Sequence, residues 1–262
     1  MVVALALFAA LAQLAVGREH AEALCPGRTS LKGYGHVDVV PTGWDNVSVR
    51  ENGNVVTHMN GRAYFADKCQ DGHYDHRDYL ALNLLGKTLR YTVDLSGAGC
   101  GCNSALYLTS MKQNSNKSTC GDYYCDANSV CGVKCAEIDI QEANMYAWHS
   151  TLHTAEDRNG LGAGIGGGGS AWNGPRTWDE SEYGPEGRCI DTSKPVDVAV
   201  SFPMDSEGVL RAMVVKLSQK GSPCPLELNL GGYKGMKDVS EALEAGMTPI
   251  VSYWNSGNMM WL

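Results

Sequence analysis

The sequence has little positive charge. Lysine and arginine together number 21 against 29 aspartate and glutamate residues, which gives a formal net charge of −8 at pH 7. No cluster of lysine or arginine occurs, and proteins that bind nucleic acid or anionic membranes use such clusters to hold phosphate groups. The charge therefore argues against nucleic acid and against a membrane as partners, and it leaves neutral or cationic ligands.

Long hydrophobic runs are also missing, except at the start. MVVALALFAALAQLAVG, residues 1–17, is shorter than a bilayer span and has small residues at Ala15 and Gly17 before the polar REHAE. This pattern predicts a secretory signal peptide that is cleaved near Gly17 rather than kept as an anchor. We therefore expect a secreted, extracellular protein. No linker or second compositional block follows, so residues 18–262 are expected to form a single domain.

The cysteines lack the spacing of a zinc site. All ten follow the predicted signal peptide, and no pair of CxxC motifs is present. An even number of cysteines in a secreted chain indicates disulfide bonds. The sequons Asn46-Val-Ser48 and Asn116-Lys-Ser118 predict a glycoprotein in the same compartment.

Helical periodicity is scarce, and alternation takes its place. In TLRYTVDL, residues 88–95, apolar and polar side chains alternate with a period of two, which is typical of a strand with one buried face. Similar runs occupy residues 105–111, 196–202, 210–218 and 249–254. Only residues 238–247 have a helical pattern. The sequence therefore predicts an all-β protein, a β-sandwich or jelly roll of two antiparallel sheets with few short helices.

A nucleotide-binding context is absent as well. The glycine tract at residues 160–170 contains Gly162-x-Gly164-x-x-Gly167, which satisfies the dinucleotide-binding expression. No parallel strand pattern precedes this tract, and AWNGPRTWDE after it cannot open a helix. We interpret the tract as a flexible loop and expect no cofactor.

What the sequence does contain is a tight group of carboxylates. KCAEIDIQEANMYAWHSTLH, residues 134–153, places Glu137, Asp139 and Glu142 within six residues. On a regular strand Glu137 and Asp139 share one face, and Glu142 points to the opposite face with the isoleucines of the segment. A bulge between Asp139 and Glu142 would return Glu142 to the face of Glu137. A helix would spread the three carboxylates around its axis.

The residues alone leave several interpretations of this group open. One is a solvated acidic strand face, but Cys131 and Cys135 would anchor the segment, which favours a built site. Another is glycoside hydrolysis, in which two carboxyls flank a sugar as nucleophile and acid/base, and Asp139 would orient the nucleophile.

A metal site is the third interpretation. The carboxylates could be joined by the pair His149-x3-His153, and GHYDHRDY, residues 72–79, offers His73, Asp75 and His76. Neither group matches an EF-hand or an HExxH motif. We therefore expect no metal.

The segment AEIDIQEAN, residues 136–144, resembles the signature Glu-x-Asp-x-x-Glu-Ala-Asn of glycoside hydrolase family 7, the retaining cellulases that fold as a β-jelly roll. Further matching segments follow the order of that family, namely residues 84–111, 123–128, His153, 183–202 and 242–262. The resemblance implies a secreted enzyme that cleaves β-1,4-glucosidic bonds in cellulose or a related β-glucan such as mixed-linkage glucan. It also implies a substrate cleft in the sandwich.

Position by position, the resemblance implies roles for individual residues. Glu137 would be the nucleophile, Asp139 its supporting carboxylate, Glu142 the acid/base and His153 the active-site histidine. The positions expected to bind substrate, as cleft-lining groups or sugar platforms, are Asn103, Tyr107, Tyr124, Asp126, Asn128, Trp254 and Trp261. The implied mechanism is double displacement, and the neighbouring anions would raise the pKa of the acid.

The chain departs from the family pattern in length. It ends at Trp261-Leu262, where the family motif continues, so it resembles a compact or a truncated member. The family partner of Cys100 lies beyond that end, so we expect Cys100 to pair differently or not at all. Fewer loops imply an open groove and favour endo-acting cleavage over processive release of cellobiose. We expect a monomer. The alternative function is a catalytically impaired, lectin-like, carbohydrate-binding jelly roll.

Overall fold

The computed structural model describes residues 24–42, 47–166, 176–257, 259 and 261–262. The signal peptide predicted at residues 1–17, the sequon at Asn46 and the last glycine of the motif, Gly167, lie outside these residues. Within the described part of the chain, no helix has the length and apolar character needed to cross a bilayer.

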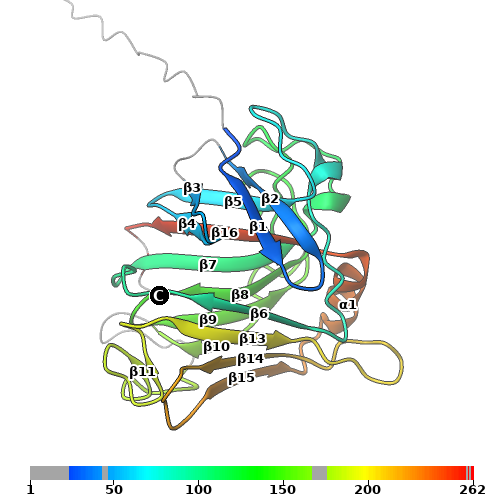
Figure 1. Ribbon diagram of the computed structural model, residues 1–262. Helices are drawn as coiled ribbons and strands as arrows, with labels where there is room; N and C mark the ends of the chain where they lie inside the picture. The colour runs from blue at the N-terminus through cyan, green and yellow to red at the C-terminus, as the bar shows by residue number, and fades with distance from the viewer. Residues whose placement is uncertain (1–23, 43–46, 167–175, 258, 260) are drawn as a thin grey trace, which may run out of the picture.

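The larger of the two main sheets has eight antiparallel strands in the order β1-β2-β5-β16-β7-β8-β9-β10. Its strands are β1 Gly27–Leu31, β2 Gly35–Pro41, β5 Gly61–Ala66, β7 Cys102–Thr109, β8 Glu137–Ala143, β9 Trp148–His153, β10 Leu161–Ile165 and β16 Thr248–Asn255. Figure 1 shows β16, the last strand of the chain, running between β5 and β7. A strand from the end of the described residues therefore lies in the middle of the sheet that carries the carboxylate segment, β8.

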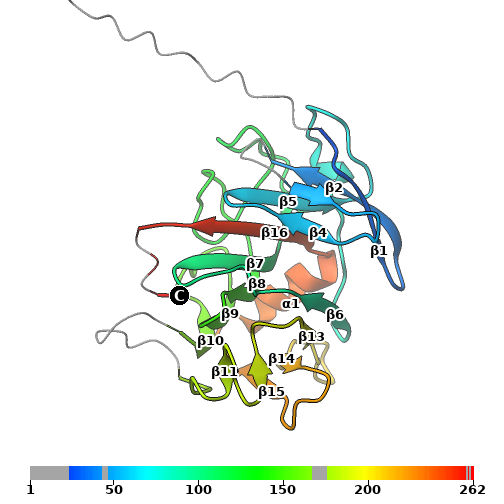
Figure 2. The same ribbon diagram turned by 60° about the vertical axis from the view of Figure 1, so that its left-hand side comes forward.

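The smaller sheet has four antiparallel strands in the order β15-β14-β13-β6 (Figure 2). They are β6 Thr88–Val93, β13 Val196–Ser201, β14 Ala212–Ser218 and β15 Leu226–Gly231. In β15 the three leucines are buried and the residues between them are exposed. This strand is not among those predicted from the sequence, and its alternation sets one face of the sheet against the core and the other against solvent.

The remaining elements are short. They are the strand pairs β3 Val47–Val49 with β4 Val55–Thr57 and β11 Tyr183–Gly184 with β12 Ile190–Asp191, the 3-10 helices η1 His76–Asp78 and η2 Met111–Gln113, and the helix α1 Met236–Ala245. The α-helix buries Val239 and Leu243, in agreement with the helical pattern of the sequence.

The main core lies between the two sheets. Ile138 and Ile140 of β8 are fully buried in it, together with Val196, Val198 and Val200 of β13. Burial of each such side chain contributes about 1.5–3 kcal/mol relative to exposure. The prediction that the two isoleucines face the core is confirmed, and so is the predicted all-β sandwich of two antiparallel sheets.

The predicted element bounds differ from the observed ones at their ends. The strand expected at 105–111 begins earlier, at Cys102, and ends at Thr109, because Met111 starts the turn η2. The strand expected at 210–218 begins at Ala212. The other three predicted strands appear as β6, β13 and β16.

A loop from residue 110 to residue 136 joins β7 to β8 and carries two of the disulfides. The disulfides of the described residues are Cys25–Cys69, Cys120–Cys131, Cys125–Cys135 and Cys189–Cys224. The anchoring expected of Cys131 and Cys135 is thus confirmed, whereas Cys100 and Cys102 are free thiols. Buried residues of this loop pack against β5, β7 and β16, on the face of the large sheet that points away from the small sheet.

Candidate active site

Strand β8 is irregular at its carboxylates. Its register with β9 pairs Asp139 with Thr151 and then Glu142 with His149, so two residues of β8 lie opposite one residue of β9. The register with β7 shifts at the same place. The predicted bulge between Asp139 and Glu142 is therefore confirmed.

The bulge reverses the parity of the strand. Ile140 lies in the core between the sheets, and Gln141 points the same way, since its Oε1 accepts a hydrogen bond of 3.1 Å from the hydroxyl of Tyr91 on β6. With two consecutive side chains on the inner face, Glu142 is turned to the outer face. Glu142 therefore joins Glu137 on the face that the small sheet does not cover.

Glu137 is a buried carboxylate with a backbone partner. Glu137 is 6% exposed. Its Oε2 accepts a hydrogen bond of 3.1 Å from the N–H of Ala127 in the loop between β7 and β8. Burial raises the pKa of Glu137 well above its usual value, and the charges of Asp139 and Asp126 raise it further. The charge of Glu142 adds to this effect, because the two glutamates lie on the same face.

The pKa of Glu142 is also raised, for similar reasons. Burial is the largest cause of its raised pKa, and the charge of Asp139 is the second. The amide of Asn103 opposes both, because its Nδ2 donates a hydrogen bond of 2.9 Å to Oε1 of Glu142. Burial and the nearby charge of Asp139 therefore both favour the protonated form of Glu137 and of Glu142.

Asp139 is paired with His153. The Oδ2 of Asp139 lies 3.1 Å from Nε2 of His153, and both side chains are buried. The other ring nitrogen, Nδ1, lies 3.1 Å from the backbone carbonyl of Asp157. A carbonyl only accepts hydrogen bonds, so Nδ1 donates, and the Nε2 contact then needs a proton of its own. Burial lowers the pKa of His153, but the hydrogen bond and charge of Asp139 outweigh it and raise that pKa overall.

Two tyrosines lie beside the nucleophile position. Tyr107 of β7 is the register partner of Asp139, and its hydroxyl is 3.2 Å from the hydroxyl of Tyr124. Burial is the largest cause of the raised pKa of both tyrosines, and the negative charge of Glu137 raises it further. Asp126 is buried on the same loop, and Asn128 is exposed there.

The two predicted sugar platforms lie near Glu142. Trp254 of β16 is the register partner of Asn103, and its ring centroid is 6.5 Å from that of Trp261. Trp261 in turn meets the ring of His149 edge-on at 6.1 Å. Both indoles keep part of their surface exposed. The structure thus brings apolar aromatic surface to the end of the site where Glu142 lies.

Sequence reasoning did not foresee three groups at this site. The N–H of Ala127 left no signal, because backbone donors have none. Arg62 of β5 is buried with its guanidinium 3.9 Å from the ring centroid of Tyr124, and no pattern marked it. His149 was noted only as a possible metal ligand. Its burial lowers its pKa to about 4, so it is neutral beside Glu142 above that pH.

The second histidine-rich segment has other contacts. Asp75 accepts hydrogen bonds from the backbone and guanidinium of Arg77, and Nδ1 of His76 lies 2.8 Å from the carbonyl of Lys112. Over the described ranges, no three His, Cys, Asp or Glu side chains form a group that could hold a metal ion.

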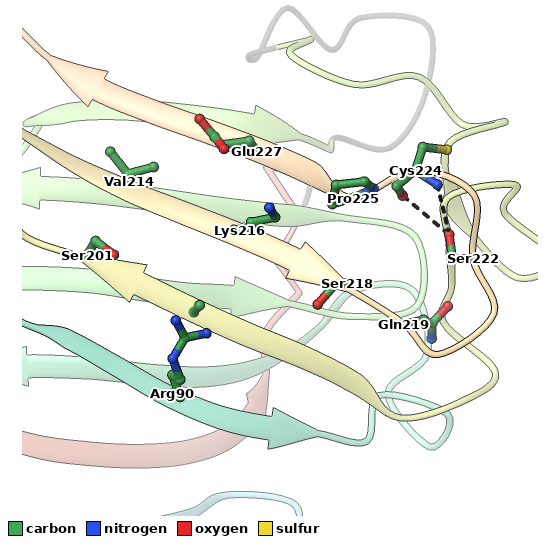
Figure 3. Close-up of a pocket in the computed structure, with 11 residues that line it drawn as sticks. Arg90, Ser201, Val214, Lys216, Ser218, Gln219, Ser222, Cys224, Pro225 and Glu227 are labelled. Atoms are coloured by element: carbon green, nitrogen blue, oxygen red, sulfur yellow. Dashed lines mark hydrogen bonds between the residues drawn. The ribbon is translucent and has the colours of Figure 1, made fainter.

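A groove of about 580 Å³ lies elsewhere, on the outer face of the small sheet (Figure 3). Arg90, Ala199, Lys216 and Glu227 form one row across its four strands. None of the predicted site residues lines this groove. It faces the opposite side of the sandwich from Glu137 and Glu142.

Comparison with known families and proteins adds to this geometry. Residues 33–131 match the model of glycosyl hydrolase family 7. Endoglucanase EG-1 of Hypocrea jecorina is 31% identical over 225 residues, which cover 71% of this chain and 47% of that protein. Endo-beta-1,4-glucanase celB of Emericella nidulans is 27% identical over 279 residues, 81% of this chain and 64% of that protein. The chain thus spans about half to two thirds of the length of these relatives.

Solved structures share the fold. The native endocellulase EGI of Humicola insolens superposes with a TM-score of 0.56 at 25% identity, over 86% of this chain and 67% of that one. A family 7 cellobiohydrolase from Daphnia pulex gives a TM-score of 0.57 at 19% identity, over 86% of this chain and 67% of that one. The second likeness concerns the fold alone.

Proposed function

The chain belongs to glycosyl hydrolase family 7, and from this premise we propose that the protein hydrolyses β-1,4-glucosidic bonds in cellulose or a related β-glucan. The observation that carries the proposal is the bulge in β8, which turns Glu142 to the face of Glu137. Two carboxyls that flank one space are what glycoside hydrolysis requires.

We assign the two carboxyls as in a retaining mechanism. Glu137 attacks the anomeric carbon while Glu142, protonated, gives its proton to the glycosidic oxygen, so the first sugar leaves and a glycosyl-enzyme ester forms. Glu142 then takes a proton from water, which attacks the ester and releases the second sugar with retained configuration. The raised pKa of Glu142 supports its part as acid, because burial and the charge of Asp139 both favour its protonated form.

Asp139 and His153 fit a supporting part. Their pairing holds a negative charge next to both glutamates and fixes its position. That charge raises the pKa of Glu137 and of Glu142, so one of them keeps a proton. As sugar contacts we propose Tyr107, Tyr124, Asp126, Asn128, Trp254 and Trp261, with the indoles as stacking platforms.

We also propose that the enzyme is endo-acting, secreted and monomeric, with residues 18–262 as one catalytic domain. The relatives named above are called endoglucanases, which supports internal cleavage. Four disulfides support an oxidising, extracellular environment. The side chain of Asn116, the residue that would carry the glycan, is exposed.

The test is hydrolysis of soluble carboxymethyl cellulose, mixed-linkage glucan and chitosan by the wild type and by Glu137→Gln. We expect new reducing ends from the two glucans, none from chitosan, and a rapid fall in viscosity because internal bonds break. Cellobiose as the dominant product from the first minutes would contradict endo action. Binding of cello-oligosaccharides without any reducing-end release would favour the lectin-like alternative instead.

A further inference from the structure

Asn103 lies at the start of β7, between β16 and β8, and its side chain is fully buried. The family resemblance implies a substrate contact for it. The structure gives its amide a different partner, since Nδ2 donates to Oε1 of Glu142 at 2.9 Å. A buried amide that donates to the proposed acid/base contacts that carboxyl and not solvent.

We propose that Asn103 is a positioning residue that keeps the transferable proton of Glu142 on Oε2, the oxygen that Asn103 does not contact. The inference rests on the proposed function, in which Glu142 is the acid/base. An oxygen that accepts an N–H at hydrogen-bond distance is the worse site for a proton, because that proton would face the donor. Oε1 is therefore held as the acceptor, and Oε2 carries the proton to the glycosidic oxygen.

The other end of the amide supports this assignment. Its Oδ1 is buried and has no hydrogen-bond partner among the described residues. A buried acceptor without a donor costs free energy, so the amide is oriented by its contact with Glu142. Turning the amide over would set Oδ1 against Oε1, and two acceptors repel each other unless Oε1 bears the proton.

The electrostatic surroundings make this one contact matter. The titratable groups near Glu142 on β8 and β9 are Glu137, Asp139, His149 and His153. Burial and the charge of Asp139 raise the pKa of Glu142, and Asn103 lowers it. His149 is neutral above about pH 4 and therefore adds no charge in the working range. Removing the amide donor removes the group that counteracts burial and Asp139.

The test compares the wild type with Asn103→Leu, which is of similar size and has no donor. We expect the alkaline limb of the kcat/KM profile on mixed-linkage glucan to move up by about one pH unit, because Glu142 must be protonated to act. At the acidic plateau kcat should fall by ~10-fold or more, with KM within about twofold. An aryl cellobioside with a dinitrophenolate leaving group, which needs no proton, should lose far less.

Two further variants keep the result interpretable. Asn114→Leu removes another buried asparagine, whose Nδ2 bonds only the carbonyl of Tyr123, and should leave the alkaline limb in place. Asn103→Ser, whose hydroxyl is too short to reach Glu142, should reproduce the shift if the leucine variant does not fold. A raised KM with an unmoved alkaline limb would overturn the inference and restore a substrate contact.

A readout without turnover separates this inference from the proposed function. If the wild type cleaves no glucan, the proposed function fails. The inference can still be tested, because NMR of protein labelled at the glutamate δ carbon follows the carboxyl carbon of Glu142 without turnover. Glu142→Gln identifies its resonance. The chemical shift of this resonance is then followed as a function of pH. A titration midpoint that is higher in Asn103→Leu than in the wild type supports the positioning role, and equal midpoints contradict it.

Discussion

Charged residues occur on strands of both sheets, but in different surroundings. On the small sheet, Lys216 of β14 and Glu227 of β15 are register partners, and both side chains are exposed on the outer face. On the large sheet, Glu137 and Asp139 of β8 are 6% and 7% exposed. The residue types are similar, so the difference lies in what covers each sheet.

The cover of the large sheet is the loop between β7 and β8. It is closed by Cys120–Cys131 and Cys125–Cys135, and it brings Tyr124 and the N–H of Ala127 to the carboxylates. Water screens charges on an exposed face, and such pairs contribute little. Under cover, burial disfavours the charged form of Glu137 and of Glu142, and the charge of Asp139 adds to this, so the pKa of both glutamates is raised. Burial therefore favours the protonated form of these carboxyls, which the proposed acid requires.

The largest effect that separates the two sheets is expected from the nucleophile. Glu137→Gln should lower kcat on mixed-linkage glucan by ~10⁴-fold or more, because the glycosyl-enzyme ester cannot form. Glu227→Gln, the same substitution on the outer face, should leave kcat unchanged. Initial rates of reducing-end release measure both, and an active Glu137→Gln would remove Glu137 as nucleophile.

A smaller effect, dependent on the substrate, is expected at Glu142. Glu142→Gln should lower the rate on glucan by ~10²–10⁴-fold, since the leaving sugar is no longer protonated. Formation of the glycosyl-enzyme from a dinitrophenyl cellobioside should be nearly spared, and a burst of dinitrophenolate reports it. An equal loss on both substrates would argue against Glu142 as the acid.

The stability of the fold should show the cost of the buried charges. A carboxyl whose pKa is raised in the folded state contributes stability below its unfolded pKa, and this contribution is lost as pH rises through the folded pKa. The raised pKa of His153 has the same effect: it contributes stability below the unfolded pKa of the histidine, and this contribution is lost as pH rises through the folded pKa.

Glu142→Gln removes one of these titrations. At pH 8 the free energy of unfolding of the variant should exceed that of the wild type by about 1 kcal/mol or more. Each kcal/mol corresponds to about 2–4 °C in Tm. At pH 4 the two should be alike. Thermal unfolding at both pH values tests this, and a variant that is less stable at pH 8 would contradict the raised pKa of Glu142.

The smallest effect is expected on the outer face of the small sheet. Lys216→Ala and Glu227→Gln should each change the free energy of unfolding by less than about 0.5 kcal/mol, because exposed charges interact weakly. Denaturant titration measures the change. A loss above 1 kcal/mol in either variant would mean that this face is not simply solvated.

Part of this comparison was predictable from the sequence. Alternation predicted three of the four strands of the small sheet, β6, β13 and β14, because one face of each is core and the other is solvent. The misplaced parity of Glu142 predicted the bulge in β8. Parity works here because only one face of a strand can enter the core between the sheets.

Other features depend on contacts between distant segments and left no local pattern. The position of β16 between β5 and β7 follows from packing of the whole sheet. The partner of Asn103 depends on the register of β7 against β8, which the bulge itself shifts. The burial of Arg62 under the covering loop is likewise a tertiary effect. A strand that is covered on both faces hides its alternation, and this is why β8 is the harder strand to interpret.

The central claim is that the bulge turns Glu137 and Glu142 to the same face, where they act as the nucleophile and acid/base of a retaining site, whose carboxyls generally lie about 5–5.5 Å apart. The most direct test is proton NMR of the first product released from a β-glucan, recorded before the sugar mutarotates. The account predicts the β-anomer. An initial α-anomer would mean inversion, and it would contradict the assignment of Glu137 and Glu142 as a retaining pair.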